Sequence, residues 1–263
     1  MSELIEAIIL GLVQGITEFL PVSSSGHLEI FKFILGDKSL AEESMLTTVF
    51  LHFATALATI FVFRNEVLKL IRGFFNPSDQ ESKKYVLFIV ISMIPAALVG
   101  FFFDDIIEQF FYQQLVLVGS CLIFTGFLLW ISEKIKTQEK ELNVFRATII
   151  GISQAVGILP GVSRSGSTIA TSLMLGIKKE EAARFSFLMV IPLIFGKIAK
   201  DLLSGDFMAH MPSVAYLILG FSAAFFTGIW ACKFMVKIVN ASKLSWFAIY
   251  CIFAGVTAIF VGM

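Results

Sequence analysis

The sequence reads G-L-V-Q-G-I-T-E-F-L-P-V-S-S-S-G-H-L from Gly11 to Leu28, and a similar pattern follows 140 residues later. The second stretch reads G-I-S-Q-A-V-G-I-L-P-G-V-S-R-S-G-S-T, from Gly151 to Thr168. Both contain Gly, Gln, Leu-Pro, Val-Ser and Ser-Gly in the same order, and both interrupt an apolar chain. Charged and hydroxyl side chains at membrane depth are costly, so the paired stretches predict a functional site.

The composition is that of a membrane protein. Of 263 residues, 57% are hydrophobic, 29 are Phe and only 15% are charged, whereas soluble domains are about 25% charged. The formal net charge of zero gives no electrostatic reason to expect nucleic acid as a partner. The N-terminal apolar run lacks a basic flank and a small-residue cleavage site, so we expect no cleaved signal peptide. Cys121, Cys232 and Cys251 lack C-x-x-C spacing and are expected to be buried thiols, not disulfides or metal ligands.

Six apolar runs reach or approach the roughly 20 residues that a spanning helix needs. They extend over Thr47 to Phe63, Tyr85 to Phe103, Tyr112 to Ile131, Ala182 to Ile198, Pro212 to Ala231 and Leu244 to Gly262. Trp130, Trp230 and Tyr112 fall near the ends of these runs, as interfacial aromatic residues do.

Two further regions contain shorter apolar segments. Leu4 to Leu20 stops at Pro21 and a serine cluster, and a short helix is expected to follow to about Leu35. The segments Phe145 to Leu159 and Gly166 to Ile177 repeat this arrangement. Two helices too short to span, joined by a polar turn, predict a re-entrant hairpin surrounded by protein or by a water-filled cavity.

The distribution of Lys and Arg predicts the topology. If each hairpin returns to its side of entry, four segments share one side and carry 15 of the 20 cations, against four on the other side. The four segments are Arg64 to Lys84, Lys134 to Arg146, Lys178 to Arg184 and Lys233 to Lys243. The positive-inside rule then places these segments in the cytoplasm and both termini outside. Hairpin helices that spanned fully would give the same parity.

Three spans, an odd number, separate the two hairpins, so the second hairpin is inverted relative to the first. We therefore predict an all-α polytopic membrane protein with six full spans, two re-entrant helix hairpins and an inverted-topology internal repeat. Residues 1–263 would form a single membrane domain, with repeats at about 1–131 and 144–263. Broken helices of inverted repeats place ligand sites near the bilayer midplane.

Arg164 and the serines around it suit an anion. A guanidinium fork binds phosphate in a bidentate way, and helix N-termini offer free N–H groups and a positive dipole end. The serine clusters begin at Ser23 and Ser163, each at the expected start of a helix. One serine per helix would suffice as an N-cap, so three in a row favour additional ligand contacts. A structural bridge between Arg164 and Glu18 is the alternative.

Acid–base groups lie in the first stretch. Ser24 and His27 are three residues apart, on one face of a helix, and could form a nucleophile–base pair. Gln14 and Glu18 share another face and could hold a divalent cation or orient a nucleophile. Alternatively, His27 is a hydrogen-bonded interior residue. His52 is expected to be a hydrogen-bonded packing residue, and His210 to lie in a loop. Lys197, Lys200 and Asp201 are expected at a helix end, with the charged groups at the interface.

These residues resemble the bacitracin-resistance family of undecaprenyl pyrophosphate phosphatases over the whole chain. The family motif (E/Q)-x-x-x-E reads Q-G-I-T-E from Gln14 to Glu18, and P-V-S-S-S-G-H follows from Pro21 to His27. The second motif reads P-G-V-S-R-S-G-S-T from Pro160 to Thr168. Position 14 has the Gln that the motif permits, so no carboxylate is required there.

The resemblance implies a phosphatase of the bacterial cytoplasmic (inner) membrane, with its active site facing outside. It would hydrolyse undecaprenyl diphosphate to the monophosphate, recycle the lipid carrier of cell-wall synthesis, and confer bacitracin resistance when overproduced. It implies a divalent cation, Mg²⁺ or Ca²⁺, with Glu18 as the candidate ligand. The expected catalytic residues are Glu18, Ser24, His27 and Arg164, and the expected substrate-binding residues are Gln14, Ser23, Ser25, Ser163, Ser165 and Thr168.

The mechanism implied leaves the nucleophile open among Ser24, His27 and an activated water, with Glu18 as base or cation ligand. Expected partners are the polyprenyl diphosphate and membrane lipids, with a homodimer as a candidate assembly. The alternative function is a secondary transporter or a polyprenyl-phosphate flippase that uses the same midplane site, because inverted repeats with broken helices are common among transporters. A nucleophile, a histidine, a carboxylate and an arginine at one site favour the enzyme.

Overall fold

The computed structural model describes residues 3–35, 41–103, 114–135, 138–204, 212–241 and 243–263. Within these residues the regular structure is α-helical, with one isolated β-bridge between Lys140 and Ile177. Five of the described helices are long and apolar enough to cross a membrane, or up to six if one bent pair counts as a span. The prediction of an all-α polytopic membrane protein is therefore confirmed.

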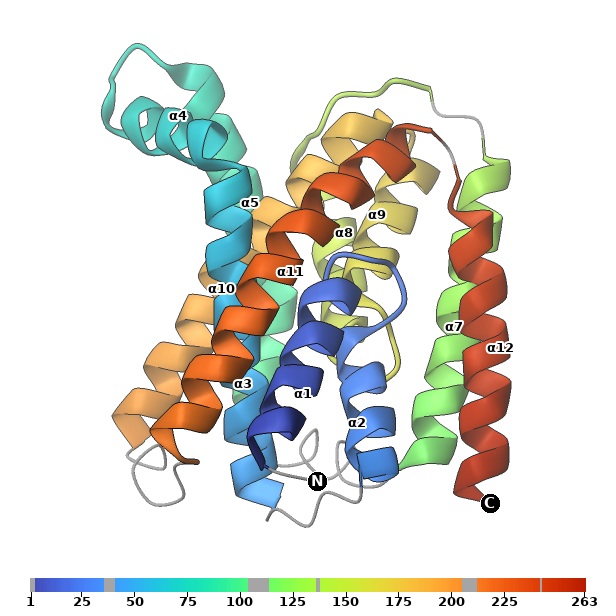
Figure 1. The fold of residues 1–263 in the computed structure, drawn as a ribbon. Coiled ribbons are helices and arrows are strands. Elements are labelled where there is room, and N and C mark those ends of the chain that lie inside the picture. The colour runs from blue at the N-terminus through green and yellow to red at the C-terminus, as the bar shows by residue number, and fades with distance from the viewer. Residues whose placement is uncertain (1–2, 36–40, 104–113, 136–137, 205–211, 242) are drawn as a thin grey trace.

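Eleven helices are described (Figure 1). The long ones are α3 (Ala41–Val62), α5 (Gln80–Phe102), α7 (Leu115–Lys134), α10 (Lys179–Ser204), α11 (Val214–Asn240) and α12 (Ser245–Gly262). The short ones are α1 (Glu3–Thr17), α2 (Ser24–Leu35), α4 (Arg64–Phe75), α8 (Val144–Val156) and α9 (Arg164–Met174). Each long helix covers most of one predicted apolar run, and residues 112 and 113 of the third run lie outside the described residues.

Each of the two predicted breaks lies between a pair of short helices, and the re-entrance of these pairs stays a prediction. α1 ends at Thr17 and α2 begins at Ser24, while α8 ends at Val156 and α9 begins at Arg164. In Figure 1, α1 lies beside α2 and α8 beside α9. All four are shorter than the roughly 20 residues that a spanning helix needs. Pro21 and Pro160 lie in the two turns, where a proline cannot interrupt a helical hydrogen bond.

Helix α4 is an addition to the predicted elements, because the sequence predicts a connecting segment from Arg64 to Lys84. The chain bends by 81° between α3 and α4, and α4 projects from the rest of the bundle (Figure 1). Leu68, Ile71 and Phe75 are exposed along α4, and Lys69 and Arg72 lie among them. An apolar stripe with basic flanks is typical of a helix that lies in the membrane interface.

Glycines allow close contacts between helices. A Cβ atom at Gly15 of α1 would lie 2.0 Å from Thr227 Oγ1 and 2.5 Å from the Ala224 carbonyl oxygen, both in α11. A Cβ atom at Gly119 of α7 would lie 2.5 Å from the Gly255 carbonyl oxygen of α12. Small residues at such contacts let backbones approach, which drives helix association in lipid. The first hairpin is therefore held tightly against α11.

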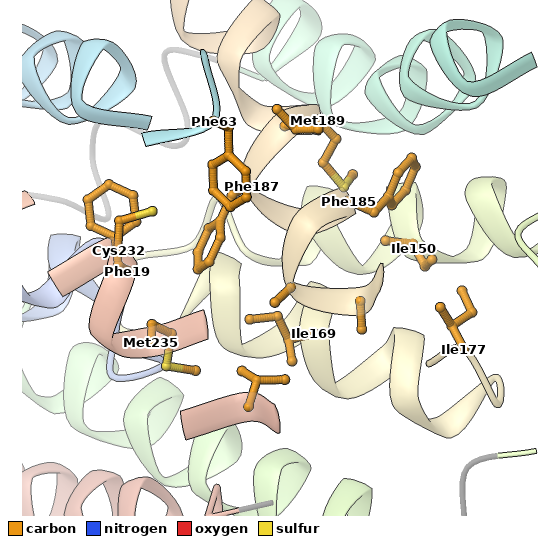
Figure 2. Packing of buried hydrophobic residues seen from close by; sticks show 14 of the residues in the cluster. Phe19, Phe63, Ile150, Ile169, Ile177, Phe185, Phe187, Met189, Cys232 and Met235 are labelled. Carbon is orange, nitrogen blue, oxygen red and sulfur yellow. The ribbon is translucent and has the colours of Figure 1, made fainter. Parts of the chain in front are cut away.

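The largest buried hydrophobic cluster of the described residues joins α10 to α8, α9 and α11, with Phe19 of the first turn at one side (Figure 2). The rings of Phe19 and Phe63 both pack against Phe187, at centroid distances of 5.5 and 6.1 Å. Phe19 directly follows Glu18, so this packing fixes the turn that carries the carboxylate. The three cysteines are free thiols, as predicted; Cys232 and Cys251 are buried and Cys121 is half-buried.

Candidate functional site

One serine in each hairpin caps a helix. Ser23 Oγ accepts a hydrogen bond from the Gly26 N–H at 3.2 Å, and Ser163 Oγ accepts one from the Gly166 N–H at 3.0 Å. Ser23 has a φ of +69°, which is unusual and strained for a residue other than glycine. Capping therefore accounts for Ser23 and Ser163, both of which were predicted to bind substrate. The strained backbone at Ser23 sets the direction of Ser24, the first residue of α2.

The two turns meet inside the protein. A Cβ atom at Gly26 would lie 2.9 Å from the Gly161 Cα atom, so the backbones of the two hairpins are in contact. Ser165 Oγ donates to the Leu20 carbonyl oxygen at 3.3 Å, across the same contact. The residues of the two matching stretches are therefore neighbours in space.

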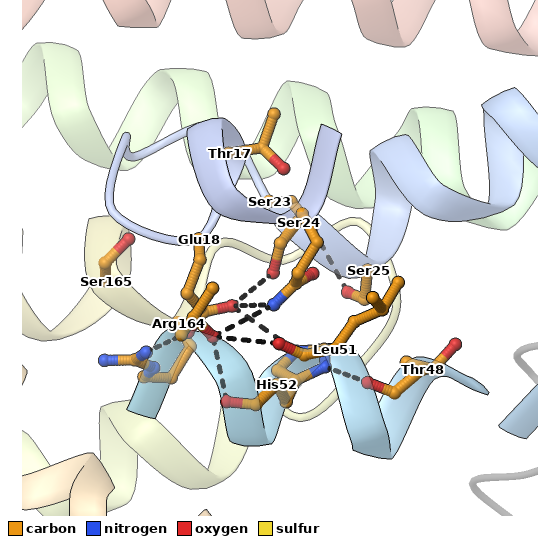
Figure 3. A network of polar contacts seen from close by, with 12 residues as sticks. Thr17, Glu18, Ser23, Ser24, Ser25, Thr48, Leu51, His52, Arg164 and Ser165 are labelled. Carbon is orange, nitrogen blue, oxygen red and sulfur yellow. Dashed lines mark hydrogen bonds and ion pairs between the residues drawn. The ribbon is translucent and has the colours of Figure 1, made fainter. Parts of the chain in front are cut away.

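Glu18 is the centre of a polar network (Figure 3). Its carboxylate accepts hydrogen bonds from Gln14 Nε2 at 3.0 Å and Ser24 Oγ at 2.7 Å, and it pairs with Arg164 Nη2. The His52 Nε2 atom lies 3.3 Å from Glu18 Oε2. Glu18 is only 7% exposed, and a buried carboxylate is stable only when it is paired and hydrogen-bonded in this way.

Arg164 connects the network to α10. Its Nη1 atom donates to the Ser186 carbonyl oxygen at 3.2 Å, while Nη2 pairs with Glu18. Thr168 packs behind it, because its hydroxyl bonds to Ser186 Oγ at 2.6 Å and to the Arg164 carbonyl oxygen at 2.9 Å. Thr168 is fully buried, so it supports the position of Arg164 and does not face the cavity.

A cavity of about 240 Å³ opens beside this network. One part of its wall is polar and the rest is mostly apolar, which suits a ligand with a charged head and a hydrocarbon tail. The polar lining residues are Glu18, Ser24, Ser25, Thr48, His52, Gln154, Arg164 and Lys197, and the others are Val49, Ala96, Gly157, Ile158, Val162, Val190, Leu193 and Ile194.

Four of the predicted site residues line the cavity, namely Glu18, Ser24, Ser25 and Arg164. Gln14 is fully buried and contacts Glu18 from outside the lining. The other predicted residues have structural contacts: Ser23 and Ser163 cap α2 and α9, Ser165 bonds across to the first hairpin, and Thr168 bonds to Ser186 of α10.

His27 does not reach Ser24 or the cavity lining. Its Nδ1 atom donates to the Ser23 carbonyl oxygen at 2.8 Å, and its Nε2 atom accepts from the Tyr250 hydroxyl of α12 at 2.7 Å. The two rings are stacked at 5.6 Å. The predicted nucleophile–base pair of Ser24 and His27 is therefore not formed in this structure. The arrangement matches the alternative of a hydrogen-bonded interior histidine, and a catalytic role for His27 stays a prediction.

Thr48, His52, Gln154 and Lys197 line the cavity but were not predicted as site residues. His52 was expected to be a packing residue, but it contacts Glu18 and lines the cavity. Lys197 was expected at the interface, and it also lines the cavity. A signal for His52 was available: Thr48, His52, Thr55 and Thr59 follow helical spacing and form a polar stripe along an apolar span. His210 lies outside the described residues.

The described residues do not form a site that would hold Mg²⁺ or Ca²⁺ by themselves. Among them, no group of three or more His, Cys, Asp or Glu side chains could ligate a metal ion. Glu18 is the acidic residue of the cavity lining, and its carboxylate is already engaged by Arg164, Ser24 and Gln14. A protein site for either ion normally needs further oxygen ligands.

Comparison with known proteins gives consistent matches over nearly the whole chain. Residues 7–257 match the family described as "Bacitracin resistance protein BacA". The "Undecaprenyl-diphosphatase" of Christiangramia forsetii is 53% identical over 257 residues, which cover 98% of this chain and 97% of that protein. The protein of the same description from Parabacteroides distasonis is 46% identical over 97% of this chain and 96% of its own length. That from Methanococcus vannielii is 40% identical, with 97% and 99% covered.

Proposed function

The chain belongs to the bacitracin resistance protein BacA family, and on that basis we propose that it is an undecaprenyl-diphosphatase embedded in the membrane. It hydrolyses undecaprenyl diphosphate to undecaprenyl phosphate and inorganic phosphate. The reaction returns the lipid carrier to cell-wall synthesis. It also confers bacitracin resistance, because it removes the diphosphate that the drug captures.

One observation carries the proposal: a hydroxyl, a carboxylate and a guanidinium meet at the polar end of a largely apolar cavity. Ser24, Glu18 and Arg164 all line that cavity, and Glu18 bonds to both of the others. Anion binding would need only the arginine. The short contact between a hydroxyl and a buried carboxylate adds a nucleophile with its base, which favours an enzyme over a carrier.

The geometry supports attack by Ser24. Ser24 Oγ donates to Glu18 Oε2 at 2.7 Å, so Glu18 can take its proton as the oxygen attacks the terminal phosphorus. The Oγ–P bond forms as the bond between that phosphorus and the bridging oxygen breaks, and undecaprenyl phosphate leaves. Glu18 then gives the proton of Ser24 to the departing oxygen of undecaprenyl phosphate and is a carboxylate again. It next takes a proton from a water that attacks the phosphorus of the phosphoserine. The Oγ–P bond breaks, phosphate leaves, and Glu18 returns a proton to Ser24 Oγ. In the shorter route, a water held by Glu18 attacks directly. His27 is the weaker candidate nucleophile, because its Nε2 faces Tyr250.

Arg164 provides charge stabilisation in both routes. Its fork can bind two oxygens of the transferred phosphoryl group, and the effect is large where water is excluded. The apolar lining would hold the first part of the isoprenoid tail. The described residues offer few ligands for the Mg²⁺ or Ca²⁺ expected from the resemblance. Such an ion would bind mainly to oxygens of the diphosphate.

The arrangement of the helices supports re-entrant hairpins in inverted repeats. Both termini lie at the lower end of the bundle in Figure 1, from which α1 starts, whereas α8 follows a connection that passes over the upper end. The hairpins therefore approach each other from opposite ends and meet at the cavity. With α3, α5, α7, α10, α11 and α12 as the six spans, the end that carries α4 and most of the cations is cytoplasmic. The active site and both termini then face outside the inner membrane.

Labelling of single cysteines tests this orientation. In a variant without Cys121, Cys232 and Cys251, a cysteine is placed at the exposed Asn76 or at the exposed Met263. An impermeant maleimide added to intact cells should label position 263, and position 76 only after permeabilisation. The reverse pattern would invert the topology. Cross-linking of the same variants in membranes tests the predicted homodimer.

Phosphate release from undecaprenyl diphosphate by purified protein in detergent tests the function. The wild type should release phosphate, and Arg164→Ala should lower kcat/KM by about 1,000-fold through loss of charge stabilisation. Near-normal turnover of Arg164→Ala would contradict the mechanism. No release by the wild type, combined with movement of undecaprenyl phosphate across liposomes, would favour the transporter instead.

A further inference from the structure

We propose that His52 is a further catalytic residue, which donates a hydrogen bond to the phosphoryl group that is transferred. The inference rests on the proposed phosphatase function. His52 lies in α3, its side chain is 25% exposed, and it lines the same cavity as Arg164 and Ser24. A phosphate that reaches the Ser24 hydroxyl therefore also comes close to His52.

Hydrogen bonding defines the state of the His52 ring. Nδ1 lies 2.8 Å from the Thr48 carbonyl oxygen, which can only accept, so Nδ1 carries a hydrogen. Nε2 lies 3.3 Å from Glu18 Oε2, and an ionised carboxylate can also only accept. With Nδ1–H bound to Thr48, Nε2 can donate to Glu18 only when both ring nitrogens carry a hydrogen, that is, when His52 is an imidazolium cation. The Nε2 atom thus faces Glu18 at the edge of the substrate space, and in the cation it is the donor that a phosphoryl oxygen could meet.

The contact with Thr48 fixes the direction of this donor. Thr48 precedes His52 by one helical turn, so the bond between them holds the ring plane against α3. Nε2 consequently points away from its own helix and toward the turn of the first hairpin (Figure 3). A donor fixed in this way needs little reorganisation to bind a transition-state oxygen.

Glu18 has more donors than its catalytic role needs. Gln14 and Ser24 bond to it within the first hairpin, and Arg164 and His52 reach it from other elements that line the cavity. A bound diphosphate presents several anionic oxygens, which compete with Glu18 for Arg164 and His52. When Arg164 and His52 turn to the phosphoryl oxygens, Glu18 keeps Gln14 and Ser24 and is free to take the Ser24 proton. Substrate binding would thus release the base at the moment it is needed.

Amide substitutions separate the two ring nitrogens of His52. His52→Gln places an N–H group near the position of Nε2, His52→Asn places one near Nδ1, and His52→Ala removes both. We expect His52→Ala and His52→Asn to lower kcat/KM for undecaprenyl diphosphate by about 100-fold, the usual effect of losing one transition-state donor. His52→Gln should stay within about tenfold of the wild type.

Thr59→Ala is the matched control. Thr59 lies on the same polar stripe of α3 and is buried, but it is not part of the cavity lining, so near-normal turnover is expected. Melting temperatures in detergent show whether each variant is folded. Wild-type activity of His52→Ala, or equal losses in His52→Gln and His52→Asn, would overturn the proposal, because a purely structural role has no preference for the Nε2 position.

Binding of farnesyl methylenediphosphonate, a non-hydrolysable lipid diphosphate, separates this inference from the proposed function. We expect His52→Ala and His52→Asn to bind it about tenfold more weakly than the wild type and His52→Gln. If the wild type releases no phosphate but shows this binding pattern, the phosphatase function fails and the contact of His52 with phosphate stands. Equal binding by all four proteins would refute the contact.

Discussion

Ser24 Oγ lies 2.7 Å from Glu18 Oε2, across the turn that separates the two helices of the first hairpin. Glu18 follows the end of α1, and Ser24 begins α2 directly after the strained backbone of Ser23. The turn therefore brings a hydroxyl and a carboxylate together within one short segment and presents both to the cavity. A nucleophile and its base need this relationship before any substrate arrives.

Ser24→Ala distinguishes the two routes of hydrolysis. If Ser24 is the nucleophile, kcat should fall by at least about 1,000-fold with little change in KM, because the group that bonds to phosphorus is gone. Acid-quenched wild type should then contain phosphoserine at position 24, detectable by mass spectrometry. A loss of less than about tenfold, without phosphoserine, would instead assign the attack to water.

Arg164→Ala should destabilise the protein by about 3–5 kcal/mol, because it leaves the Glu18 carboxylate buried without its cation. The double variant Glu18→Gln/Arg164→Gln removes both charges and should regain most of that stability, although it remains inactive. Thermal unfolding in detergent measures both effects. A double variant as unstable as Arg164→Ala would show that packing, and not the unpaired charge, causes the loss.

Gly15→Ala should separate α1 from α11. The added Cβ atom would meet the Ala224 carbonyl oxygen at 2.5 Å, and a backbone atom cannot move aside as a side chain can. We expect a loss of about 3 kcal/mol or more in stability, with a loss of activity, because Glu18 lies one turn further along. Gly196→Ala in α10 is the matched control. Apart from its chain neighbours and the nearby backbone of α10, none of the described residues has an atom within 4 Å of that Cβ position. Melting temperature and activity should therefore change little.

Tyr250→Phe tests the position of His27. Without the hydroxyl, His27 Nε2 has lost its donor in a buried position, which should cost about 1–3 kcal/mol of stability. We expect kcat to stay within about threefold of the wild type, because both residues lie outside the cavity lining. A large fall in kcat with an unchanged melting temperature would indicate that His27 acts in catalysis.

The sequence predicted the helical elements well because lipid imposes simple rules. The long apolar runs correspond to α3, α5, α7, α10, α11 and α12, and Pro21 and Pro160 lie in the two breaks between short helices. Helix α4 was not predicted, because the Lys and Arg residues among its apolar residues are also typical of a cytoplasmic loop. Amphipathic spacing along Leu68, Ile71 and Phe75 would have revealed it.

The site was predicted less completely, because a motif shows which residues are close in the chain and not which way they face. Helical spacing placed Ser24 and His27 on one side of α2, yet one faces Glu18 and the other Tyr250. His52 belongs to neither hairpin, so its contact with Glu18 depends on how α3 packs against α1. Only the assembled helices could show that contact.

The pairing of Glu18 with Arg164 also affects how the protein is made. The two residues are 146 positions apart, so the ribosome produces the first hairpin long before the counter-ion of its carboxylate exists. An unpaired charge at the bilayer centre costs about 2.5–3.5 kcal/mol on insertion scales. If the first hairpin is re-entrant, as we propose, we expect it to reach its final depth only after the second has emerged. A nascent chain that stops before Arg164 would lack the cation for Glu18, so we expect synthesis of the C-terminal part of the chain to complete the insertion of the N-terminal part.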